Sequence, residues 1–166
     1  MVRSENVMIP ASGVDLRISA TYLIPENAHP KPPLIIMGLG IGAVKAAGPL
    51  PFAERFVAAG YATLRFDYLF FGESEGKPAN LMSIPRELQD FLDVVAWARQ
   101  QDNQWDVNRL IVWGTSFGGM HITALMAEDH GLAAGIMQCP CVDGLAAVMK
   151  VSLWRTLRML PFILGD

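Results

Sequence analysis

Hydrophobic residues form two kinds of pattern along this chain. Continuous apolar runs at 34–37 and 110–113 are typical of strands buried on both faces of a sheet. Segment 85–101 instead repeats its apolar residues at helical spacing: Leu88, Phe91, Leu92, Val95 and Ala98. Together with the turn residues between them, these patterns predict strands over 7–10, 16–23, 34–37, 61–68, 109–113 and 133–139, and helices over 51–59, 85–101 and 121–129.

The order of these elements predicts an α/β fold in a single domain over residues 1–166. A strand hairpin is followed by alternating strands and helices, which favours a mostly parallel sheet with helices on both faces. The opening hairpin would form an antiparallel edge. Ligands in such sheets bind at the carboxyl ends of the strands, where both the glycine-punctuated loop 38–42 and Ser116 are expected.

The apolar positions also predict which helix faces are packed. In 51–59, Phe52, Phe56 and Ala59 share one face. Residues 146–160 form an amphipathic pattern whose polar face is basic, with Lys150, Arg155 and Arg158. The pattern favours a helix packed over the domain, and a membrane surface or a partner protein is the alternative.

The pattern G-x-S-x-G occurs twice, at 72–76 and 114–118. A nucleophile elbow needs a strand that runs into the serine and a helix that leaves from it, so that the hydroxyl stands above the sheet and the helix N-terminus faces the reacting oxygen. Ser116 has both neighbours. Ser74 lies between two glutamates, whose charge disfavours an alkoxide, and no strand leads directly into it, so we interpret it as part of a polar turn.

Composition narrows the classes of function. The chain has 166 residues, of which 52% are hydrophobic, and a net charge of −3, which argues against nucleic-acid binding through bulk charge. It lacks both an apolar signal core and a run of about 18 apolar residues that could span a membrane, so we expect a cytoplasmic protein. We interpret Cys139 and Cys141 as thiols of a reducing compartment, and we expect neither a metal site nor a cofactor.

A serine hydroxyl becomes a useful nucleophile only with a base, an acid that orients the base, and donors for the developing oxyanion. The donors are readily nominated. One is the backbone N–H of Phe117, directly after the serine, and the other belongs to Gly40 or Ile41 in the loop after the third strand.

No histidine has a convincing position for the general base, which stays unassigned. His29 lies in a proline-rich loop on the wrong side of the topology, and His130 closes the helix roughly 20 Å along from Ser116. The side chain of His121 should leave the helix wall away from the serine oxygen. Asp143, just past the last strand, is the candidate acid, with a turn or helix cap as the alternative role.

Three blocks of this sequence resemble the α/β-hydrolase superfamily. Residues 34–45 read LIIMGLGIGAVK, residues 66–76 read FDYLFFGESEG, and residues 113–121 read WGTSFGGMH. Together they are similar to the branch that contains polyketide-transferase-like and related fungal and bacterial hydrolases. The resemblance implies that Ser116 is the nucleophile, that Phe117 and Ile41 are the oxyanion donors, and that the turn at 72–76 is not catalytic.

Two departures from the family pattern matter. Many relatives carry His-Gly in the oxyanion loop, where this chain has Leu39-Gly40. The family's acid and histidine follow later strands, and this chain ends before them. The sequence therefore resembles the N-terminal part of a longer hydrolase: a C-terminally truncated product, a mispredicted reading frame or a catalytically incomplete descendant.

Two functions follow as hypotheses. The first is a serine hydrolase or acyltransferase of ester or thioester substrates, and the resemblance implies secondary metabolism in which a polyketide synthase delivers the acyl chain. The second is a catalytically incomplete remnant or binding module that keeps the fold. A sheet that stops at 133–139 would expose its last strand, which predicts a homodimer through that edge or poor solubility.

Overall fold

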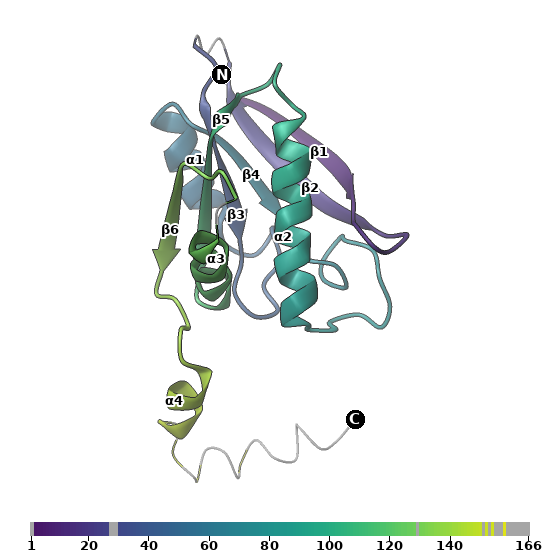
Figure 1. Cartoon of the computed structure of the whole chain (residues 1–166), viewed down its shortest axis with the longest axis vertical. Helices are drawn as coiled ribbons and strands as arrows, with labels where there is room; N and C mark the ends of the chain where they lie inside the picture. Colours follow the sequence, from purple (N-terminus) through teal and green to yellow (C-terminus); the bar gives the residue numbers. More distant parts are fainter. Residues whose placement is uncertain are drawn as a thin grey trace.

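The computed structural model describes residues 2–26, 30–128, 130–150, 152, 154 and 158. Its centre is a six-stranded sheet with the order β1-β2-β4-β3-β5-β6 (Figure 1). The strands are β1 (Val2–Pro10), β2 (Arg17–Pro25), β3 (Pro33–Gly38), β4 (Ala62–Phe66), β5 (Asp106–Thr115) and β6 (Ala134–Gln138). The helices are α1 (Leu50–Ala58), α2 (Ile84–Arg99), α3 (Phe117–Ala127) and α4 (Gly144–Met149).

The pairing directions divide the sheet into two parts. β1 and β2 form an antiparallel hairpin, and β2 is also antiparallel to β4. From β4 onward the pairs β4–β3, β3–β5 and β5–β6 are parallel. This arrangement confirms the predicted α/β fold, with a mostly parallel sheet and an antiparallel hairpin at one edge.

The alternation of side chains along β3 explains the two helical layers. Leu34 and Ile36 belong to a buried cluster that includes residues of α2 and α3. Ile35 and Met37 belong to a second cluster that includes residues of α1. Because successive strand residues point to opposite faces, α1 covers one face of the sheet and α2 and α3 cover the other (Figure 1). This confirms the prediction of helices on both faces.

The packed face of α1 differs from the predicted one. Ala53 and Val57 are the buried residues of this helix, whereas Phe52 is 43% exposed. Small side chains at i and i+4 let the helix lie close to the sheet, so the bulkier Phe52 lies at the margin, where its ring is 5.5 Å from that of Trp113. Phe56, which also belongs to the predicted face, is partly buried and packs against the same cluster as Ala53 and Val57, so the predicted face is packed only in part.

The predicted helix over 146–160 is only partly described. α4 ends at Met149, and most of the remaining stretch lies outside the described residues, so the longer helix stays a prediction. Within the described part of the chain, no helix has the length and apolar character that crossing a membrane requires.

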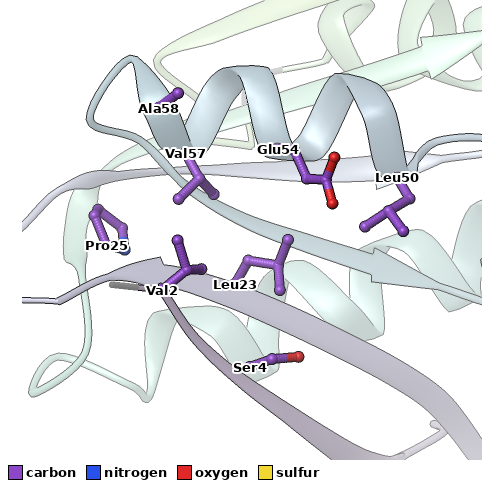
Figure 2. A pocket seen from close by; sticks show the side chains of 8 residues that line it. All are labelled: Val2, Ser4, Leu23, Pro25, Leu50, Glu54, Val57 and Ala58. Carbon is purple, nitrogen blue, oxygen red and sulfur yellow. The ribbon is translucent and has the colours of Figure 1, made fainter.

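A groove of about 470 Å³ lies between α1 and the β1–β2 hairpin. Figure 2 shows side chains of Val2, Leu23 and Val57 approaching one another there from β1, β2 and α1. Pro25, which also lines the groove, lies beyond the β2 residues that pair with β4, next to the amino end of that strand. The groove is therefore remote from the carboxyl ends of the parallel strands, where Ser116 lies.

Candidate active site

Ser116 occupies a sharp turn between β5 and α3. The strand ends at Thr115 and the helix begins at Phe117. The serine backbone has φ 53° and ψ −115°, a conformation that non-glycine residues rarely adopt and that costs on the order of 1–3 kcal/mol. Its amide donates to the carbonyl of Gln138 at 2.9 Å, and its carbonyl accepts from the amide of Cys141 at 2.9 Å. The side chain is exposed, as a nucleophile at an elbow must be.

Glycines make the crowding around this turn sterically feasible. A Cβ on Gly114 would lie 2.4 Å from the carbonyl oxygen of Gly118. A Cβ on Gly118 would lie 2.5 Å from the carbonyl oxygen of Leu39. The strand, the first turn of α3 and the loop after β3 therefore touch through backbone atoms, and only glycine fits at both positions.

The loop after β3 also reaches Ser116 itself. A Cβ on Gly40 would lie 3.3 Å from Ser116 Cβ and 3.7 Å from Ser116 Oγ. A turn in which Ala43 N–H donates to the Gly40 carbonyl at 3.1 Å follows at once, and the Ile41 side chain between them is 62% exposed. Of the predicted oxyanion residues, Phe117 directly follows the serine, Gly40 lies close to it, and Ile41 is the next residue of the loop.

This geometry suits the stabilisation of negative charge. The N-terminal amides of a helix lack intrahelical partners, and Phe117 provides the first of them in α3. The Phe117 amide is therefore available to an anion beside Ser116, and the assignment of a second donor to Gly40 or Ile41 stays a prediction.

A buried lysine, which the sequence analysis did not single out, anchors the far end of this loop. Lys45 is 6% exposed. Its ammonium donates to Asp67 Oδ2 at 3.2 Å, Glu73 Oε2 at 2.5 Å and Ser19 Oγ at 2.9 Å. The hydrogen bond and charge of Lys45 hold the pKa of Glu73 below its usual value. The sequence carried one signal for this pair: a lysine stands among apolar residues, and an aspartate follows at the end of the next strand.

The other G-x-S-x-G segment forms the turn that the sequence predicted. Ser74 Oγ donates to the Asp67 carbonyl at 2.6 Å and accepts from the Ser19 amide at 2.8 Å. Glu75 accepts from Arg17 Nη2 at 2.7 Å. Ser74 thus ties the residue after β4 to β2, Glu75 ties the turn to β2, and the Ser74 hydroxyl both donates and accepts within this structure.

His121 is a core residue. It is 0% exposed, and its Nε2 lies 2.7 Å from Glu87 Oε2. Its ring makes edge-on contacts with Phe117 and Tyr68, with centroids at 5.1 Å and 5.7 Å. The imidazole is therefore enclosed between α2 and α3. This placement fits the prediction that the His121 side chain leaves the helix wall away from the serine oxygen.

The remaining candidates for base and acid have other partners. His130 lies just past α3, where its Nε2 is 3.3 Å from Glu128 Oε2, and His29 lies outside the described residues. Asp143 accepts from the Ala146 amide at 2.8 Å and so caps α4. The structure therefore favours the capping alternative for Asp143 over the role of catalytic acid.

A small apolar pocket adjoins the turn on the α1 face of the sheet. It has a volume of about 200 Å³, and its walls include Leu39, Phe52 and Trp113. Two neighbours of Ser116 also line the pocket. Thr115 precedes Ser116 in the chain, and the carbonyl of Gln138 accepts from the Ser116 amide. Within the described residues, no cluster of three or more metal-ligating side chains occurs.

Comparison with known proteins identifies the family. The family model for X-Pro dipeptidyl-peptidase (S15 family) matches residues 13–156, so the chain belongs to this family. The quorum-quenching protein AidA of Acinetobacter baumannii (strain MDR-ZJ06) is 43% identical over 152 residues, which are 92% of this chain and 49% of that protein. The thiohydrolase aneE of Aspergillus aculeatus is 30% identical over 84% of this chain and 42% of its own length. The chain spans about half the length of these relatives.

Solved structures agree with the fold. The α/β hydrolase GrgF from Penicillium superposes with a TM-score of 0.76 over 99% of this chain and 53% of that protein, at 24% identity. The complex of DcsB with its substrate analogue gives a TM-score of 0.74 at 28% identity, over 83% of this chain and 46% of that one. The fold is therefore that of the α/β hydrolases, and the predicted resemblance to the superfamily is confirmed. The predicted likeness to polyketide transferases is borne out by a relative of that name, grgF of Penicillium, 28% identical over 85% of this chain and 46% of its own length.

Proposed function

We propose that this member of the S15 family supplies the nucleophile of a serine hydrolase or acyltransferase that acts on esters or thioesters. The observation that carries the proposal is the strained, exposed Ser116 at a strand-to-helix turn, against which the loop at Gly40 lies so close that a Cβ on Gly40 would be 3.7 Å from Ser116 Oγ. Such strain persists only where the surroundings enforce it, and it concentrates at functional sites.

The proposed reaction begins with acylation of Ser116. Its Oγ attacks the carbonyl carbon while its proton passes to a general base, and the carbonyl oxygen takes up the negative charge beside the amides of Phe117 and Ile41. Collapse of this intermediate breaks the bond to the alcohol or thiol, which leaves with a proton. Water then completes hydrolysis, or an acceptor nucleophile completes transfer.

We further propose an apolar acyl group as the substrate class. The walls of the 200 Å³ pocket beside Thr115 are mainly apolar, and burial of a hydrocarbon chain there is favourable by about 25 cal/mol per Å². Relatives named thiohydrolase and polyketide transferase support a thioester-bound acyl chain, delivered by a polyketide synthase in secondary metabolism. We also propose a cytoplasmic location, which fractionation of the producing cells tests.

A second candidate function is a binding module without turnover. The observation in its favour is the placement of the histidines: His121 is buried against Glu87, and His130 lies beside Glu128. In the described part of the chain, each ring therefore has its Nε2 beside a carboxylate, and His121 is enclosed in the core. A cleft with oxyanion donors but no base would bind an acyl ligand without cleaving it.

Reaction with p-nitrophenyl butyrate separates the two functions. The hydrolase proposal expects release of at least one equivalent of p-nitrophenol per chain and none above background from Ser116→Ala. A single burst would indicate acylation without deacylation, whereas continued release would indicate a complete catalytic cycle. Identical traces for the two proteins would refute the nucleophile and favour the binding module.

A further inference from the structure

We propose that Lys45 and Asp67 are positioning residues that hold the oxyanion loop, residues 38–47, against Ser116. This inference rests on the proposed function only for the role of the loop, which is to supply oxyanion donors. The restraint itself is a property of the fold that can be measured without catalysis.

Three groups of Lys45 are held at once: its amide, its ammonium and its carbonyl. Its backbone amide donates to Asp67 Oδ1 at 2.5 Å, and its ammonium donates to Asp67 Oδ2 at 3.2 Å. Its carbonyl accepts from Arg65 Nη1 at 3.1 Å. A residue held by its N–H, its C=O and its side chain has little freedom to move, and both Arg65 and Asp67 belong to the end of β4 or the residue just after it.

Asp67 is in turn completely enclosed. It is 1% exposed, and its Oδ2 also accepts from the Glu73 amide at 2.9 Å. Gly72 has φ +55°, and a Cβ there would lie 2.3 Å from Asp67 Oδ2. The turn at 72–76 therefore wraps the carboxylate, which explains why a glycine-rich segment without chemistry of its own accompanies this strand end.

The loop transmits this restraint over a short distance. Two successive turns connect the fixed ends: Ala43 N–H donates to the Gly40 carbonyl at 3.1 Å, and Ala47 N–H donates to the Val44 carbonyl at 2.8 Å. The other end of the loop is fixed where Leu39 meets the first turn of α3 at Gly118. The exposed Ile41 lies between these two fixed points, so the position of its amide depends on both.

Oxyanion donors act only when they are held close to the productive geometry, and an error of about 1 Å can cost on the order of 100-fold in rate. We therefore expect Lys45→Met to slow acylation of Ser116 by about 10- to 100-fold. The same change leaves the Asp67 carboxylate buried without its cation, which lowers stability as well. The single variant alone cannot separate these effects.

The separating experiment uses Lys45→Met, Asp67→Asn and the double variant Lys45→Met/Asp67→Asn. The rate of Ser116 labelling by a fluorophosphonate, the melting temperature, and hydrogen exchange of the amides in 38–47 are measured for each. The double variant removes both charges of the buried Lys45–Asp67 pair, so its melting temperature should recover part of the loss seen in Lys45→Met. Its labelling should stay at least 10-fold slow and its loop amides should exchange faster than in the original chain.

Arg17→Met, which removes only the exposed ion pair with Glu75, is the matched control and should label at the original rate.

The possible failures are distinguishable. Labelling of the double variant at the original rate, or unchanged exchange in 38–47, would overturn the positioning role while leaving the nucleophile intact. Failure of the original chain to label would overturn the proposed function. Hydrogen exchange would still decide whether Lys45 and Asp67 restrain the loop.

Discussion

At the scale of single residues, the site depends on the absence of side chains as much as on their presence. Gly114 and Gly118 let backbone atoms of β5, α3 and the oxyanion loop meet. Gly40 brings that loop to Ser116. The surrounding backbone holds Ser116 in its strained conformation. Adding one methyl group at any of these glycines should therefore disturb the position of Ser116.

Gly118→Ala should therefore both destabilise the fold and displace the oxyanion loop. Its new Cβ would lie 2.5 Å from a backbone carbonyl, and overpacking of this kind costs about 1–3 kcal/mol of unfolding free energy. Denaturant unfolding measures the loss. Gly144→Ala, where no atom lies within 4 Å of the new Cβ, is the matched control and should change stability by less than about 0.5 kcal/mol. Equal effects of the two substitutions would contradict the packing argument.

Asp143→Ala distinguishes a helix cap from a catalytic acid. Because the Asp143 carboxylate accepts from the Ala146 amide, its removal should weaken α4 by about 1 kcal/mol or less. It should leave the rate of Ser116 labelling within twofold of the original. A large drop in labelling with α4 unaffected would instead assign Asp143 to the catalytic machinery.

At the scale of elements, α2 shows what a hydrophobic pattern omits. The predicted apolar stripe is present, but Glu87, Asp90 and Asp93 are buried as well. Asp93 accepts from the Ser12 amide and hydroxyl in the turn between β1 and β2. Asp90 accepts from the amide of Leu69 at 2.9 Å and from Arg86. Ser12 and Leu69 come from distant parts of the chain, so sequence periodicity could not reveal why the helix buries these acids.

Burial raises the pKa of Asp90 to about 6 from a reference value of 3.8, although the Leu69 amide and Arg86 oppose the rise. Between these two pH values the folded protein keeps a proton that the unfolded chain has lost. The contribution of Asp90 to stability therefore falls as pH rises through this window, by up to about 3 kcal/mol. The difference in unfolding free energy between the original chain and Asp90→Asn, measured from pH 4 to pH 7, should shrink accordingly. A difference independent of pH would contradict this ionisation.

The strands show a similar division between what was predictable and what was not. The sequence located β3, β4 and β6 from their apolar runs. Such a run can be recognised when both faces of the strand contribute to a core or when the strand follows a clear turn. β1 begins at Val2, five residues before the predicted start, because its polar half is held by backbone pairing with β2 while its side chains are exposed. An edge strand of this kind carries no hydrophobic signature.

At the scale of the whole molecule, β6 is an open edge of the sheet that the described residues form. In the described part of the chain, β6 lies at the edge of the sheet and pairs only with β5 (Figure 1). Its Ile136 and Met137 are 38% and 45% exposed. Unpaired backbone groups beside apolar side chains invite pairing with another strand. We propose that two copies of this chain associate through β6.

Light scattering tests this association. The original chain should shift from monomer to dimer as its concentration rises, and Ile136→Lys/Met137→Lys should stay monomeric. Met8→Lys places a charge at a residue 40% exposed on the opposite edge strand and should leave the dimer intact. A monomer at all concentrations, or equal sensitivity to Met8→Lys, would exclude the β6 interface.

The sequence was sufficient for the architecture and for the position of Ser116, because strand-to-helix turns carry a strong local signature. It did not reveal the support for the site. Lys45 and Asp67 meet only after the chain has placed β4 beside β3, and Ser74 bonds to Asp67 and Ser19 across two strands. Such contacts depend on topology, which local patterns of residues do not encode.

The central claim is that Ser116, and not the serine of the other G-x-S-x-G segment, is an activated nucleophile. Intact mass of the purified chain after exposure to a fluorophosphonate tests this most directly, with Ser116→Ala and Ser74→Ala alongside. The account predicts one adduct per chain, lost in Ser116→Ala and retained in Ser74→Ala. A folded chain that forms no adduct, or an adduct that survives Ser116→Ala, would contradict it.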